Sequence, residues 1–161
     1  KIEINVRETF SILGYNMKEL ATRSEWFDGK INIRTFELEE LLATKLRALY
    51  QRKKGRDVFD LWIALTQEDI DKEQLVQIFL KYMKDGNHHI TKSLFENNLS
   101  KKLDDASSSA DITSLLSANF NGSEISRNGK SNKNLNTNSS WNIRNAAKII
   151  HDKLLIYLPM N

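Results

Sequence analysis

One cluster of charged residues in this chain has the composition that phosphate chemistry requires. Lys45 precedes the basic loop Arg52–Arg56, and two carboxylates, Asp57 and Asp60, follow it. The aspartates are three residues apart, so a helix places them on one face. Lys45 falls on the leucine side of an apolar helical pattern. Its ammonium either extends to the edge of the core or points into a cleft to meet an anion such as a triphosphate, and helical phase leaves both roles open.

Each aspartate also has a purely structural interpretation. Asp57 lies where the first turn of a helix is expected, and a negative charge there stabilises the helix dipole. Asp60 lies among apolar residues, where a carboxylate requires a partner. The candidate partners are Lys45, Arg47 and Arg56.

A third carboxylate, Glu3, belongs to a segment that is predicted to form a strand. Lys1–Arg7 alternates strictly between apolar and polar residues, which is the period of a half-buried strand. Glu3 lies on the polar face, and on this pattern alone it is a solvent-facing glutamate. The functional alternative is a rigidly held metal ligand, because oxygen donors on strands suit Mg²⁺.

The elements that must position these residues follow from the apolar periodicity. A second strand, Lys30–Phe36, is predicted behind an Asp28–Gly29 turn, and the segment before it is irregular or strand-like. Six helices are then expected, at about 38–51, 57–65, 71–82, 90–103, 111–118 and 141–157. Thr35 is the expected cap of the first helix, and Leu94 is one of the residues expected in the core. A polar surface loop is expected at about 121–140.

Composition excludes several classes of protein. The 161 residues are 40% hydrophobic, contain no cysteine and carry a formal net charge of +3. A core can therefore form, whereas a disulfide framework and thiolate chemistry cannot. No apolar run approaches the ~20 residues of a membrane-spanning helix, and no leader opens the chain, so a cytoplasmic protein without membrane contact is expected. Because the chain begins at Lys1 within a strand pattern, it is expected to be part of a longer protein.

Two motifs resemble a known family. The first is Glu40-Leu41-Leu42-Ala43-Thr44-Lys45-Leu46-Arg47-Ala48-Leu49, and the second is Arg56-Asp57-Val58-Phe59-Asp60-Leu61. Together they resemble the AbiEii/AbiGii toxin family of nucleotidyltransferases, and Lys1–Ile4 is similar to the strand that carries the third acidic residue of that fold. The Gly-Ser turn and the Asp-x-Asp metal pair of the family do not occur after Lys1.

The resemblance implies an α+β fold, in which a remnant of the nucleotidyltransferase mixed sheet is followed by a helical bundle. It implies a back half of the nucleotidyltransferase-like domain at 1–66 and a helical region at 67–161. It further implies nucleotide transfer from a nucleoside triphosphate (NTP) to an acceptor such as tRNA, with Mg²⁺, and a cognate antitoxin protein as partner. In that scheme Glu3 is a metal ligand.

The resemblance also assigns roles to the charged cluster. Lys45, Asp57 and Asp60 are catalytic candidates, and Lys45, Arg52 and Arg56 are the candidates for binding phosphate. The rival hypothesis is a non-catalytic helical module that binds RNA or a protein partner through the basic loop Arg52–Arg56.

Overall fold

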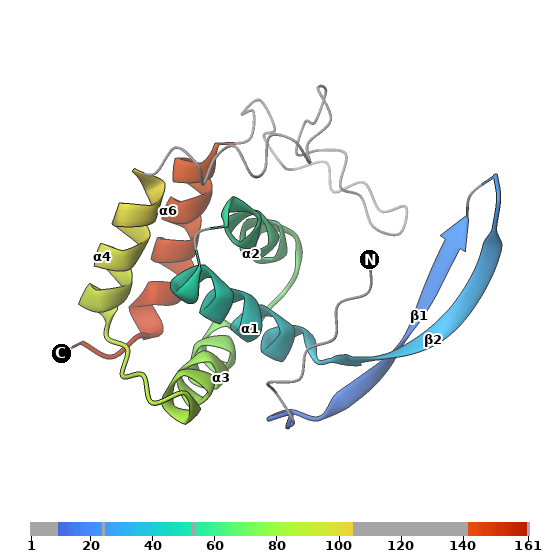
Figure 1. Cartoon of the computed structure of the whole chain (residues 1–161), viewed down its shortest axis with the longest axis horizontal. Helices are drawn as coiled ribbons and strands as arrows, with labels where there is room; N and C mark the ends of the chain where they lie inside the picture. The colour runs from blue at the N-terminus through green and yellow to red at the C-terminus, as the bar shows by residue number, and fades with distance from the viewer. Residues whose placement is uncertain (1–9, 24, 53, 105–141, 161) are drawn as a thin grey trace.

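The computed structural model describes residues 10–23, 25–52, 54–104 and 142–160. A β-hairpin is followed by a bundle of helices, which confirms the α+β class. The hairpin projects away from the helices (Figure 1). The expected strand at Lys1–Arg7, the expected helix at 111–118 and the polar loop at 121–140 lie outside the described residues. None of the described helices is long and apolar enough to cross a membrane.

The hairpin pairs β1 (Tyr15–Arg23) with β2 (Asp28–Phe36) in antiparallel register, from Tyr15 opposite Phe36 to Arg23 opposite Asp28. β2 therefore begins two residues earlier than predicted, and Asp28–Gly29 belongs to the strand and not to the turn. The Phe27 ring lies over Gly29, where an added Cβ would stand only 2.6 Å from Phe27 Cζ. A larger residue at position 29 would therefore require the exposed Phe27 ring to shift.

The helices follow the predicted order. They are α1 (Leu38–Gln51), α2 (Gly55–Gln67), α3 (Lys72–Asp85), α4 (Lys92–Leu103) and α6 (Ile143–Leu154), and the short 3-10 helix η2 (Leu155–Tyr157) closes the bundle. The third helix was expected to start at Asp71, and Asp71 caps α3, since its carboxylate accepts a hydrogen bond from Gln74 N at 2.9 Å. The predicted cap of α1 is wrong. Thr35 pairs with Asn16 inside the hairpin, because β2 continues to Phe36, and Glu37 is the N-cap residue.

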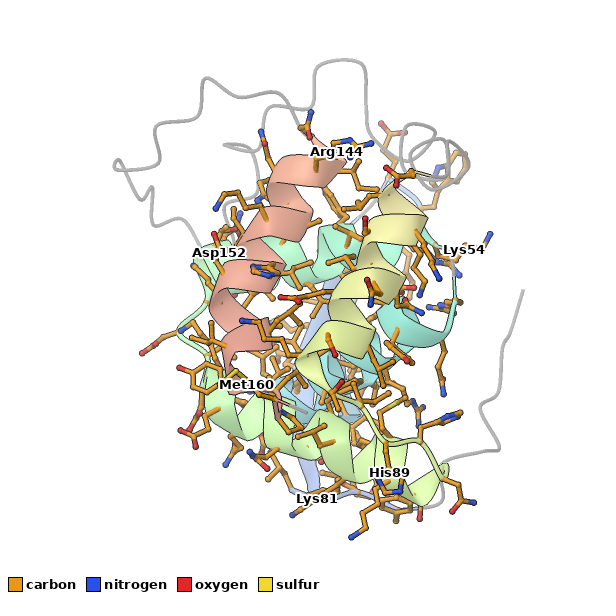
Figure 2. All side chains as sticks on the ribbon, turned by 90° about the vertical axis from the view of Figure 1, so that its left-hand side faces the viewer. Lys54, Lys81, His89, Arg144, Asp152 and Met160 are labelled. Atoms are coloured by element: carbon orange, nitrogen blue, oxygen red, sulfur yellow. The ribbon has the colours of Figure 1, made fainter. Side chains whose placement is uncertain are left out.

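The apolar faces of the five helices meet in one core. α1 packs between α2 and α3, and α6 packs against α2 and α4 (Figure 1). α4 and α6 lie side by side, with Arg144 and Asp152 near the two ends of α6 (Figure 2). Leu94 was expected in this core but is 48% exposed. The fully buried leucine, isoleucine, phenylalanine and methionine side chains are Leu46, Leu61, Leu75, Phe79, Met83, Phe95, Ile150, Leu154 and Leu155.

Two lysines from distant helices complete the ends of α1 and α2. The buried Lys102 on α4 donates hydrogen bonds to the carbonyl oxygens of Leu49 and Tyr50, in the last turn of α1. Lys153 on α6 donates to the carbonyl oxygen of Leu65, near the end of α2, at 2.7 Å. The last carbonyls of a helix lack partners within the helix and carry partial negative charge, so a cation stabilises them. These two contacts fix α1 and α2, which carry the charged cluster.

Candidate active site at the α1–α2 elbow

The charged cluster lies where α1 turns into α2. Two ion pairs connect the helices, one from Arg52 to Asp57 beside the turn and one from Lys45 to Asp60 farther along. Lys45 lies within α1, whereas Arg52 follows the last residue of that helix in extended conformation. Asp57 and Asp60 are three residues apart in α2, so each acid can meet one of these cations.

The pair nearer the turn has a buried acid. Arg52 Nε and Nη2 donate to Asp57 Oδ2 and Oδ1, each at 2.8 Å, and Asp57 is fully buried. This two-pronged geometry is the strong form of an Arg–carboxylate contact. Asp57 also occupies the first turn of α2, where its charge suits the helix dipole. The pair thus locks the elbow, and its acid is enclosed by protein.

The second pair is open to solvent. Lys45 Nζ lies 2.7 Å from Asp60 Oδ2, and the side chains are 33% and 39% exposed. Of the three candidate partners for Asp60, the structure places Lys45 beside it. Such partly exposed pairs contribute about 0–1 kcal/mol, because water competes for both groups. The Lys45 ammonium can therefore exchange Asp60 for another anion at small cost.

Arg56 takes no part in the two ion pairs described above. Arg56 is exposed on the first turn of α2, beside the exposed Lys54, which Figure 2 shows at one edge of the molecule. Glu3 lies outside the described residues. Among the residues that the structure describes, no group of three or more histidine, aspartate or glutamate side chains could hold a metal ion.

Sequence reasoning missed Glu40, which is a fully buried carboxylate on α1. Its Oε1 accepts from Ile12 N at 2.7 Å and from Tyr82 Oη at 2.5 Å. Its Oε2 accepts from Leu13 N and from Ser11 Oγ, both at 2.8 Å. One signal was available, since Glu40 precedes the buried Ala43 by three residues and so shares its face of the helix.

The four donors decide the charge of Glu40. Burial raises the pKa of this carboxyl, but the hydrogen bonds from Tyr82, Ile12, Leu13 and Ser11 together outweigh burial and lower its pKa below the ordinary value. Glu40 is therefore an ionised, fully buried carboxylate whose charge is balanced by hydrogen-bond donors.

A family model matches residues 1–131, and its description is nucleotidyl transferase AbiEii toxin of a type IV toxin–antitoxin (TA) system. The match covers the hairpin, the elbow and Glu40.

The chain belongs to the AbiEii family.

No curated protein and no solved structure matches the chain. AbiEii family membership implies a toxin–antitoxin nucleotidyltransferase that uses an NTP and has an antitoxin partner. The structure brings Lys45, Asp57 and Asp60 of the two motifs to the elbow.

Proposed function

We propose that this AbiEii chain belongs to an enzyme that transfers a nucleotide from an NTP to an acceptor such as the end of a tRNA. The observation that carries the proposal is the solvent-accessible Lys45–Asp60 pair, inside the two family motifs and beside a buried pair that fixes the elbow. An accessible cation on a rigid scaffold is what binding of a triphosphate requires.

Lys45 is the residue that meets the triphosphate. In the resting elbow its ammonium pairs with Asp60, which keeps the lysine extended at the surface of α1. A triphosphate carries more negative charge than one carboxylate, so the Lys45 ammonium exchanges Asp60 for a phosphate oxygen when the nucleotide binds. As the leaving pyrophosphate gains charge, the ammonium stabilises it more strongly than it stabilises the ground state.

Arg52 and Asp57 have a different role from Lys45. Asp57 is enclosed and binds the Arg52 guanidinium through both oxygens, so it orients that cation and does not act on substrate. Arg52 and the exposed Arg56 then present positive charge beside the elbow, where a phosphate group of the nucleotide or of the acceptor can bind.

The proposed reaction is an in-line displacement. The acceptor hydroxyl oxygen attacks the α-phosphorus, the bond from that phosphorus to the bridging oxygen breaks, and pyrophosphate leaves. A divalent ion such as Mg²⁺ would neutralise phosphate charge in this reaction. The described residues do not form such a metal site, and Glu3, the predicted ligand, lies outside them.

The test uses the full-length protein, total tRNA and NTPs labelled at either the α- or the γ-phosphate. Nucleotidyl transfer places the α-label on RNA and releases the γ-label as pyrophosphate. Transfer of the γ-label would instead indicate a phosphoryl transferase. Binding of RNA with no transfer of either label would replace the proposal by the non-catalytic module that contacts RNA through Arg52–Arg56.

A further inference from the structure

The Glu40 network joins two parts of the chain that are distant in sequence. On one side is loop Ser11–Gly14, which supplies a hydroxyl and two successive backbone N–H groups. On the other side is α3, which supplies the Tyr82 hydroxyl. The carboxylate that receives all four hydrogen bonds stands on the first turn of α1, five residues before Lys45.

The loop is shaped to receive a carboxylate. Gly14 adopts a φ of +89°, which favours glycine, and Ser11 Oγ accepts from Gly14 N at 2.8 Å. This turn directs the N–H groups of Ile12 and Leu13 toward the two Glu40 oxygens. Consecutive backbone N–H groups arranged in this way form an anion-binding concavity, and here the anion is part of the chain. We call Glu40 with its four donors the Glu40 clamp.

We propose that Glu40 is a positioning residue for nucleotide transfer, because the Glu40 clamp fixes loop Ser11–Gly14 against the helix that carries Lys45. This inference rests on the proposed function.

The clamp acts close to Lys45 along the chain. Glu40 and Lys45 are five residues apart on α1, so the two side chains are separated by about 7.5 Å along the helix axis. The loop contacts of Glu40 therefore hold the first turn of the helix on which Lys45 stands. Phosphate chemistry is sensitive to a displacement of Lys45, because about 1 Å of misplacement can cost a hundredfold in rate.

Glu40→Gln tests the clamp with almost no change in shape. Whichever way the amide turns, its NH₂ group faces a backbone N–H, either that of Ile12 or that of Leu13. One loop contact is therefore lost and replaced by two opposed donors. We expect kcat for label transfer in the full-length protein to fall about a hundredfold. The amide proton of Ile12 or Leu13 should exchange at least about tenfold faster than in the wild type.

A control separates positioning from stability. Leu154→Ala removes a fully buried side chain from α6, which carries neither the clamp nor a candidate site residue, and lowers Tm through a cavity. At an assay temperature where both variants are folded, Leu154→Ala should keep kcat within about twofold of the wild type and keep the slow exchange of the loop amides.

Two milder variants test the same inference even if Glu40→Gln does not fold. Ser11→Ala and Tyr82→Phe each remove one hydroxyl donor from a different oxygen of Glu40. Ser11 belongs to the loop and Tyr82 to α3, so the inference predicts that Ser11→Ala lowers kcat by about threefold to tenfold and that Tyr82→Phe lowers it by less.

The outcomes are distinguishable. Loss of kcat in Glu40→Gln and in Ser11→Ala, with Leu154→Ala active, supports the inference. Wild-type turnover in Glu40→Gln despite fast exchange of the loop amides overturns it, and so does an equal loss in Leu154→Ala. A wild type that transfers no nucleotide refutes the proposed function, and the inference falls with it.

Discussion

The two ion pairs of the elbow should differ sharply in what they contribute to folding. Asp57→Ala removes a fully buried carboxylate and both of its hydrogen bonds to Arg52, each 2.8 Å long. Hydrogen bonds to charged groups contribute about 1.5–3 kcal/mol each. The Arg52 side chain is 45% exposed and can return to water when its partner is lost, which offsets part of that sum. We therefore expect a loss of about 2–3 kcal/mol in the free energy of unfolding, which is less than the ~3–5 kcal/mol for pairs in which both charges are buried.

Asp60→Ala is the matched comparison, because it removes the same type of side chain from the same helix. Its pair with Lys45 is partly exposed, so the loss should stay below about 1 kcal/mol. For a chain of this size about 1 kcal/mol corresponds to a Tm shift of 2–4 °C. Asp57→Ala should thus lower Tm by about 5–10 °C and Asp60→Ala by less than about 4 °C.

The assay is urea and thermal unfolding followed by circular dichroism, with a double-mutant cycle for each pair. The coupling energy between Arg52 and Asp57 should exceed that between Lys45 and Asp60 by at least about 1 kcal/mol. Equal coupling in the two cycles, or a larger loss of stability in Asp60→Ala, would refute the division of the elbow into a scaffold pair and an accessible pair.

Two further predictions concern other contacts. Lys102→Met leaves two carbonyl oxygens at the end of α1 without their donor, so urea unfolding should show a loss of about 1–3 kcal/mol, whereas Lys101→Met on the exposed side should lose less than about 0.5 kcal/mol. His151 has a raised pKa, first through its hydrogen bonds to Asp152 and Glu96. Its folded state therefore favours the proton, and its contribution to stability is full below a pH of about 6.5 and is lost as pH rises through the folded pKa. Urea unfolding should consequently show a larger loss of stability for His151→Gln at a pH of about 5.5 than at about 8.5.

The parts of the fold that sequence predicted are those set by neighbouring residues. The Asp71 cap depends on Gln74, only three positions away, and the placement of Asp57 in a first turn depends on local charge preference. β1 was harder to predict, because the polar run Lys18-Glu19 interrupts its apolar alternation and the strand depends on pairing with β2. The residue pattern of a segment predicts a strand only weakly when pairing with another strand determines its conformation.

The candidate site shows the same limit. The Lys45–Asp60 contact follows from two helical periodicities and a short turn, and Lys45 was among the candidate partners before the fold was known. The role of Glu40 could not be derived in that way, since its donors lie 27 to 42 residues away along the chain. Lys102 likewise meets carbonyl oxygens 52 and 53 residues away. Long-range polar contacts of this kind are fixed by packing and not by local propensity.

The rate of nucleotide transfer by Lys45→Ala tests the central claim most directly. Lys148→Ala is the control, because Lys148 also pairs with an aspartate on a helix surface, Asp152 at 2.5 Å, but on α6. We predict that Lys45→Ala in the full-length protein abolishes transfer of the α-label and growth inhibition, with Tm within about 4 °C of the wild type. Lys148→Ala should keep both activities. Wild-type transfer by Lys45→Ala would contradict the account and leave Lys45 as a lysine that only covers the edge of the core.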